Sequence, residues 1–245
     1  MDFAEMLGDA FTYTREGILG NTNRWLKLIL AIICLGLPFS GYIMRIYRGK
    51  APAPDVDEWG TLFVDGLKLL VVGIVYAIPL LILWAIIYGP FFLGIAGGTM
   101  NQNVLATWKP NFVLMIIFYI VEIAVTIIMP VASIRFARTG SFAEAFNFSG
   151  ITGTIGRICW INYIVALVLV SIIVSIPILV LIFGLILIGA AALLLLKEAG
   201  LLVLLALLAL GILLFLILVP LFGVFQARYM TRLYDCAAPA EPAVS

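Results

Sequence analysis

Histidine is absent from this chain, and cysteine and charged residues are scarce. Without histidine, the commonest general base and the commonest metal ligand are both missing. Cys34, Cys159 and Cys236 lie far apart and are odd in number, so they form no disulfide or zinc framework. With a net charge of +1, the chain has no case for nucleic acid binding. These shortages favour a non-enzymatic protein with no cofactor, no metal and no nucleic acid partner.

Long uncharged runs take up most of the remaining sequence. Ile158–Leu196 and Ala199–Ala227 contain no charged residue, and each exceeds the ~20 apolar residues that cross a bilayer. Because 64% of the residues are hydrophobic, lipid is the expected solvent of the folded chain. We predict an all-α, polytopic helical membrane protein with four spanning helices. These are Gly66–Tyr88, Asn111–Ile134, Ile158–Phe183 and Leu201–Ala227, with far-side turns in Gly89–Pro110 and Gly184–Gly200.

A shorter apolar stretch, Trp25–Tyr47, precedes the predicted spanning helices. Only 17 residues, Leu28–Met44, are free of charge, and a helix of that length covers ~25 Å of the ~30 Å hydrocarbon core. Gly36-Leu37-Pro38 interrupts it near the middle. The pattern predicts a re-entrant helical hairpin that enters and leaves the membrane on one side.

Short amphipathic segments are expected to lie in the membrane interface. Met1–Gly17 has apolar residues at helical spacing on one face. A polar loop from Lys50 leads into a short element that carries Trp59, and Ser141–Ser149 is short and rich in aromatics. Residues 236–245 form a small-residue tail that we expect to be disordered.

The basic residues predict which side of the membrane each segment faces. With a re-entrant hairpin and both termini in the cytoplasm, twelve of the fourteen Lys and Arg residues lie inside. Only Lys109 and Lys197 then lie outside, which satisfies the positive-inside rule. A full crossing by Trp25–Tyr47 would worsen the split to nine against five. We therefore expect a multi-pass protein of the cell membrane.

An internal similarity suggests that one single membrane domain, 1–235, contains parallel repeats. The segment Asp9–Thr14 matches Glu144–Ser149 residue type for residue type. Phe11 and Phe146 each precede a tryptophan by fourteen residues. The pattern predicts three units, 1–50, 51–138 and 139–232, each with an interfacial helix, a membrane hairpin and an exit arginine.

With these motifs in view, the chain resembles a mainly archaeal membrane family, domain of unknown function 4013. The resemblance rests on Gly41-Tyr42 with Arg45 and Arg48, on Asp57-Glu58-Trp59-Gly60 with Leu62-Phe63 and Gly66-Leu67-Lys68, on Thr139–Phe142 with Glu144–Phe146, and on Ala227–Tyr229. It covers nearly the whole chain and departs around Gly184–Gly200, where the linker looks long. The resemblance implies an archaeal cytoplasmic membrane location, and it brings no established activity or catalytic residue.

Glu122 is the one ionisable residue deep in a predicted spanning helix. Such a residue is costly in lipid and is a functional hypothesis by default. It is expected either to be a neutral carboxyl bonded to Thr126 or a backbone carbonyl, or to serve as a proton or cation site. The exit arginines, in turn, could contact lipid headgroups or simply determine topology. They are Arg45, Arg48, Arg135, Arg138, Arg228 and Arg232.

Three classes of function remain open at this point. The scarcity of polar core residues favours a membrane assembly, scaffold or lipid-organising protein whose partners are membrane lipids and other copies of itself. Broken helices, parallel repeats and Glu122 favour a channel or transporter as the alternative. A lipid-active enzyme is the second alternative, and Asp55, Asp57 and Glu58 are the only acids that could serve it.

Overall fold

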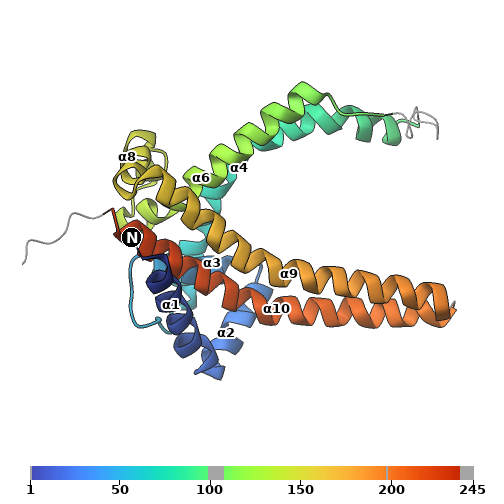
Figure 1. Ribbon diagram of the computed structural model, residues 1–245, viewed down its shortest axis with the longest axis horizontal. Coiled ribbons are helices and arrows are strands. Elements are labelled where there is room, and N and C mark those ends of the chain that lie inside the picture. The colour runs from blue at the N-terminus through green and yellow to red at the C-terminus, as the bar shows by residue number, and fades with distance from the viewer. Residues whose placement is uncertain (1, 99–107, 197, 238–245) are drawn as a thin grey trace, which may run out of the picture.

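The computed structural model describes residues 2–98, 108–196 and 198–237 (Figure 1). The described ranges are helical and contain no strand. The first part comprises α1 (Phe3–Thr14), a π-helical turn η1 (Arg15–Leu19), α2 (Thr22–Ile33), α3 (Leu37–Tyr47) and α4 (Trp59–Ala96). The second comprises α6 (Phe112–Thr139), α7 (Phe142–Ala145), α8 (Phe148–Ile158), α9 (Trp160–Leu196) and α10 (Glu198–Asp235).

Four of these helices, α4, α6, α9 and α10, are long and apolar enough to cross a membrane. Each has at least 28 residues, whereas ~20 suffice for the hydrocarbon core. The prediction of an all-α, multi-pass class with four such helices is confirmed. The amphipathic N-terminal helix predicted in Met1–Gly17 is likewise present as α1, with Asp2 as its N-cap.

The predicted ends of the long helices were wrong in three places. The segment around Trp59 is the first turn of α4 rather than a separate interfacial element. At the other end, α4 continues through Gly89 and Pro90 to Ala96, where a turn was predicted. Helix α9 likewise runs through Gly184 to Leu196. Glycine and proline are weaker helix breakers in a membrane. Neighbouring helices and local adjustments give new hydrogen-bond partners to the backbone groups that lose their helical ones. Part of the predicted turn, residues 99–107, lies outside the described residues. The same holds for Lys197 and for residues 238–245 of the predicted tail.

The helices form three hairpins, α2–α3, α4–α6 and α9–α10, and the two long ones, α4–α6 and α9–α10, diverge from a common base (Figure 1). The buried core lies in this base and not along the arms. Phe136 on α6, Tyr163 on α9 and Tyr229 on α10 are fully buried in its main cluster. Toward the tip of the α9–α10 arm, by contrast, Leu194 is 81% exposed. The arms therefore present their apolar side chains to the surrounding lipid.

The first hairpin is built from two short helices. The chain turns at Cys34–Gly36, where Leu35 and Gly36 both have positive φ, and Pro38 then occupies the first turn of α3. At 12 residues, α2 is ~18 Å long and cannot cross the hydrocarbon core alone. The interruption predicted at Gly36–Pro38 is thus present, and the re-entrant placement in a membrane stays a prediction.

Two long helices begin in the same way. Trp59 opens α4 directly after Glu58, whose φ is 49°, and Trp160 opens α9 directly after Cys159, whose φ is 77°. Non-glycine residues seldom adopt positive φ. The positive φ of Glu58 and of Cys159 therefore sets the direction in which the following long helix leaves the base.

Candidate functional site: the ion-paired base

The base is held by a very close crossing of α3 and α4. A Cβ atom at Gly41 would lie 1.9 Å from the carbonyl oxygen of Leu62, and one at Gly66 would lie 1.8 Å from that of Leu37. Only glycine fits at either position, so the two backbones touch directly. This contact brings Arg45, near the end of α3, beside the first turn of α4.

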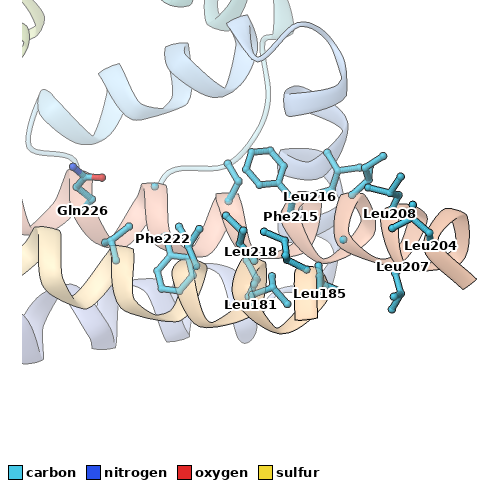
Figure 2. Close-up of a pocket in the computed structure, with 18 residues that line it drawn as sticks. Leu181, Leu185, Leu204, Leu207, Leu208, Phe215, Leu216, Leu218, Phe222 and Gln226 are labelled. Atoms are coloured by element: carbon cyan, nitrogen blue, oxygen red, sulfur yellow. The ribbon is translucent and has the colours of Figure 1, made fainter. Parts of the chain in front are cut away.

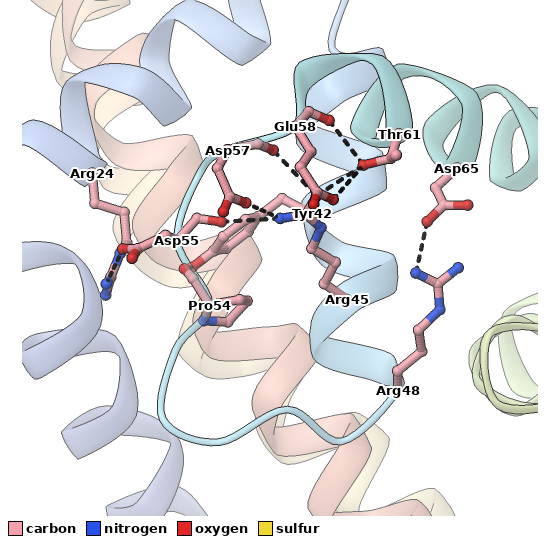
Figure 3. Close-up of polar contacts among 10 residues, drawn as sticks. All are labelled: Arg24, Tyr42, Arg45, Arg48, Pro54, Asp55, Asp57, Glu58, Thr61 and Asp65. Carbon is pink, nitrogen blue, oxygen red and sulfur yellow. Dashed lines mark hydrogen bonds and ion pairs between the residues drawn. The ribbon is translucent and has the colours of Figure 1, made fainter.

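Arg45 is the centre of the polar contacts at this crossing (Figure 3). Its guanidinium donates to the Asp57 carboxylate, to Glu58 Oε2 at 3.3 Å, to Thr61 Oγ1 at 2.9 Å and to the Asp55 carbonyl oxygen at 3.1 Å. The Arg45 side chain is only 8% exposed, whereas those of Asp57 and Glu58 remain largely exposed. The hydrogen bond from Arg45 lowers the pKa of Asp57 below its usual value.

Two further ion pairs flank Arg45 (Figure 3). Arg24 Nη2 lies 2.6 Å from Asp55 Oδ1 and ties α2 to the loop before α4. Arg48 Nη1 lies 2.6 Å from Asp65 Oδ2, whose side chain is mostly buried. The three arginines bind α2, α3, the loop and α4 into one unit.

A second group of charges joins α1 to α10. Arg228 makes two hydrogen bonds to the Asp9 carboxylate, at 2.6 and 3.1 Å, and its guanidinium lies 4.7 Å from the centre of the Tyr13 ring. Arg232 lies 3.7 Å from Asp9 and 4.0 Å from Glu5. Burial raises the pKa of Tyr13 to about 12, so its hydroxyl stays neutral beside this pair.

A third group lies at the end of α6. Arg135 donates a hydrogen bond to the Glu144 carboxylate of α7, and this bond lowers the pKa of Glu144. Arg138 Nη2 lies 2.7 Å from Asp235 Oδ1, at the end of α10. Its Nε also donates to the Tyr47 carbonyl oxygen at 2.6 Å, which connects α6 to α3.

One ion pair from each of the three groups takes part in a cyclic order along the chain. Each joins an arginine near the end of one predicted unit to an acid near the start of another. The pairs are Arg45 with Asp57, Arg135 with Glu144, and Arg228 with Asp9. The last pair connects the third unit back to the first, so the three groups close a ring. We call these three groups together, with the two pairs that flank Arg45, the ion-paired base.

All six predicted headgroup-contact arginines belong to this base. Each lies within ion-pair distance of a carboxylate of the same chain. An anionic lipid would therefore compete with protein carboxylates for these cations, and contact with headgroups stays a prediction. Among the described residues, Lys27, Lys50, Lys109 and Arg157 form no ion pair.

The acids considered for an enzyme are also part of the base. Asp57 and Glu58 accept hydrogen bonds from Arg45, and Asp55 accepts them from Arg24. Within the described ranges, no three His, Cys, Asp or Glu side chains come together as metal ligands. Sequence reasoning missed Asp9 and Glu144 as arginine partners, although both begin the repeated acid-Ala-Phe motif.

Glu122 lies far from the ion-paired base, on an exposed side of α6. It precedes Arg135 by thirteen residues, which is ~20 Å along the helix axis. The described part of the chain offers it no hydrogen-bond or ion-pair partner, so the expected bond to Thr126 or a backbone carbonyl is absent. The carboxyl faces the space around the protein.

An apolar groove of about 780 Å³ runs along the α9–α10 arm (Figure 2). Its walls are aliphatic and aromatic side chains from both helices, among them Leu181, Leu185, Leu207 and Phe222. Gln226 lies at one end, and Leu204 lies toward the other (Figure 2). Because Gln226 comes two residues before Arg228, the polar end of the groove lies at the level of the ion-paired base along α10.

Comparison with known families gives one match. A family model described as protein of unknown function, DUF4013, matches residues 26–188. The chain belongs to this family. Neither the curated proteins nor the solved structures contain a match. The matched range includes Arg45, Arg135 and Glu122, whereas Asp9 and Arg228 lie outside it.

Proposed function

We propose that this DUF4013 protein is a non-enzymatic scaffold of an archaeal cell membrane that organises lipid around its diverging arms. The proposal rests on the α9–α10 groove, which is apolar along its length and carries one amide next to a charged base. A lipid has the same division, with apolar chains and one polar end. The groove volume of about 780 Å³ is in the range of small-molecule sites.

The ion-paired base would hold the groove in position. Three groups of charges connect α1, α3, α4, α6, α7 and α10 at one end of the molecule, while the arms extend away from it (Figure 1). A rigid base with separated arms keeps apolar surface available for lipid instead of closing it into a bundle. This arrangement suits a protein that fixes the positions of lipids or of neighbouring membrane proteins.

The orientation that we propose places the base and both termini in the cytoplasm. Its support is the charge distribution, because twelve of the fourteen basic residues then lie inside. The three parallel units, 1–50, 51–138 and 139–232, are part of the same proposal. Their support is the cyclic order of the ion pairs and the shared positive-φ start of α4 and α9.

Native mass spectrometry of the protein extracted with its own lipids tests the lipid-organising role. Wild-type protein should retain a defined number of lipids. Gly211→Phe should reduce that number, because a Cβ at Gly211 points into the groove, 3.0 Å from Leu185 Cδ1. Gly184→Phe is the matched control, since Gly184 lies on the same arm with nothing within 4 Å and does not line the groove. Equal lipid retention by Gly211→Phe and wild type would contradict the proposal.

A channel or transporter that uses Glu122 is the second candidate. The observation in its favour is a carboxyl without a described partner at membrane depth. Proton and cation flux into liposomes tests it directly. Flux that Glu122→Gln abolishes and that Gly211→Phe leaves intact would favour transport over lipid organisation.

A further inference from the structure

Glu122 is part of a polar stripe on the exposed side of α6. Tyr119, Glu122 and Thr126 are spaced by three and four residues, so they lie on one face of the helix. All three are exposed, and Tyr119 is 52% exposed. Within the described ranges, the side-chain oxygens of these three residues form no hydrogen bond. We call these three residues the α6 stripe.

The α6 stripe lies within the hydrocarbon core. If Arg135 is at headgroup level, Thr126, Glu122 and Tyr119 are ~14, ~20 and ~24 Å deep along α6, and the core is ~30 Å thick. A carboxyl and two hydroxyls in contact with lipid chains are costly, because the chains offer no hydrogen bond. Another protein surface at the same depth is therefore needed to satisfy them.

We infer that the α6 stripe is the contact surface between two copies of this chain. Copies related by a two-fold axis along the membrane normal place identical residues at identical depths, so Glu122 of one copy meets Glu122 of the other. A neutral carboxyl both donates and accepts a hydrogen bond, as do the hydroxyls of Tyr119 and Thr126. The stripe is thus complementary to itself and needs no partner of opposite charge.

The composition of α6 around the stripe also supports contact with a second copy of the chain. Ile116 and Ile123 are exposed beside it and supply an apolar border. Hydrogen bonds between polar side chains of neighbouring helices are a regular source of association in membranes. The inference rests on the proposed scaffold role, and it assigns self-association to one helix face.

Energy transfer between labelled copies in liposomes tests the interface. The full chain carries donor or acceptor dye on Cys236 near the end of α10, in a background where Cys34 and Cys159 are serine. Diluting the protein with lipid then gives the dimer dissociation constant. Glu122→Leu should raise this constant about tenfold, because it removes the central hydrogen-bonding group from both copies.

Two variants separate hydrogen bonding from general disturbance of α6. Glu122→Gln keeps a donor and an acceptor and should stay within about twofold of wild type. Ile120→Ala trims a 61% exposed side chain that points away from the stripe, and it should leave dimerisation unchanged. None of these exposed residues supports the base, so the variants are expected to fold.

Several outcomes would overturn the inference. These are an unchanged dimer constant in Glu122→Leu, an equal loss in Ile120→Ala, or monomeric wild-type protein at every dilution. The groove is tested separately, because Gly211→Phe should lose bound lipid in native mass spectrometry yet keep energy transfer in liposomes. Failure of the α6 interface is thereby distinguished from failure of the proposed lipid groove.

Discussion

One added methyl group at Gly41 is expected to push α3 away from α4. A Cβ atom there would lie 1.9 Å from the Leu62 carbonyl oxygen, whereas real Cβ contacts are essentially never shorter than 3.0 Å. The obstructing atom belongs to the backbone of α4 and cannot rotate away. The helices would have to separate by more than 1 Å at the point where Arg45 makes its hydrogen bonds.

The expected cost of Gly41→Ala is about 2–3 kcal/mol of unfolding free energy. Overpacking costs ~1–3 kcal/mol when side chains can adjust, and a backbone obstacle places this site at the upper end. Separation also stretches the Arg45 bonds to Glu58 and Thr61, which are 3.3 and 2.9 Å long. A gain of ~1 kcal/mol in helix propensity offsets only part of the loss.

Gly60→Ala is the matched control for Gly41→Ala. Gly60 lies in the first turn of α4, and a Cβ there meets nothing within 4 Å. Its replacement should be neutral or stabilise the protein by up to ~1 kcal/mol. Unfolding by SDS in mixed micelles, followed by tryptophan fluorescence, measures both variants. Equal stability of Gly41→Ala and Gly60→Ala would refute the close crossing of α3 and α4.

Three more predictions concern the base and its junctions. Arg45→Met should cost only ~1–2 kcal/mol in the same SDS titration, because Asp57 and Glu58 are largely exposed and regain water when the cation is lost; a loss above ~4 kcal/mol would contradict this. Arg45 lowers the pKa of Asp57 below its ordinary value of 3.8, and Arg135 lowers that of Glu144 below its ordinary value of 4.5. The stability that both ion pairs contribute should therefore be complete above about pH 5, and it should disappear as the pH falls through the lowered pKa values. Unfolding titrations from pH 6 to pH 3 check this, and Glu144→Gln should flatten the response. Cys159→Gly should stabilise the protein by ~1 kcal/mol, because φ at this position is 77°, whereas thermal melts should find no such gain for Cys159→Ala.

The class of the fold could be predicted because it depends on composition over long windows. Runs such as Ala199–Ala227 leave no alternative to a lipid-exposed helix. The ends of those helices could not be predicted equally well. Gly89 and Pro90 stop helices in water, yet α4 passes through both, because helix packing and local adjustments at membrane depth satisfy the freed backbone groups.

The candidate site was only half visible in the sequence. The arginines stood out by their regular position after each hairpin, so they were assigned to lipid headgroups or topology. Their partners are carboxylates that can be far away in sequence, as with Asp9 and Arg228, 219 residues apart. A single sequence without contacts does not indicate which acid meets which arginine.

The sequence by itself determined that this chain is a multi-pass helical membrane protein of the DUF4013 family, because hydrophobic length and local motifs are one-dimensional properties. The tertiary structure alone decided that the exit arginines pair with acids and close a ring. It also decided that α3 and α4 touch through Gly41 and Gly66, and that Glu122 faces outward without a described partner. Those features depend on the packing angle and rotation of whole helices, which short stretches of sequence do not encode.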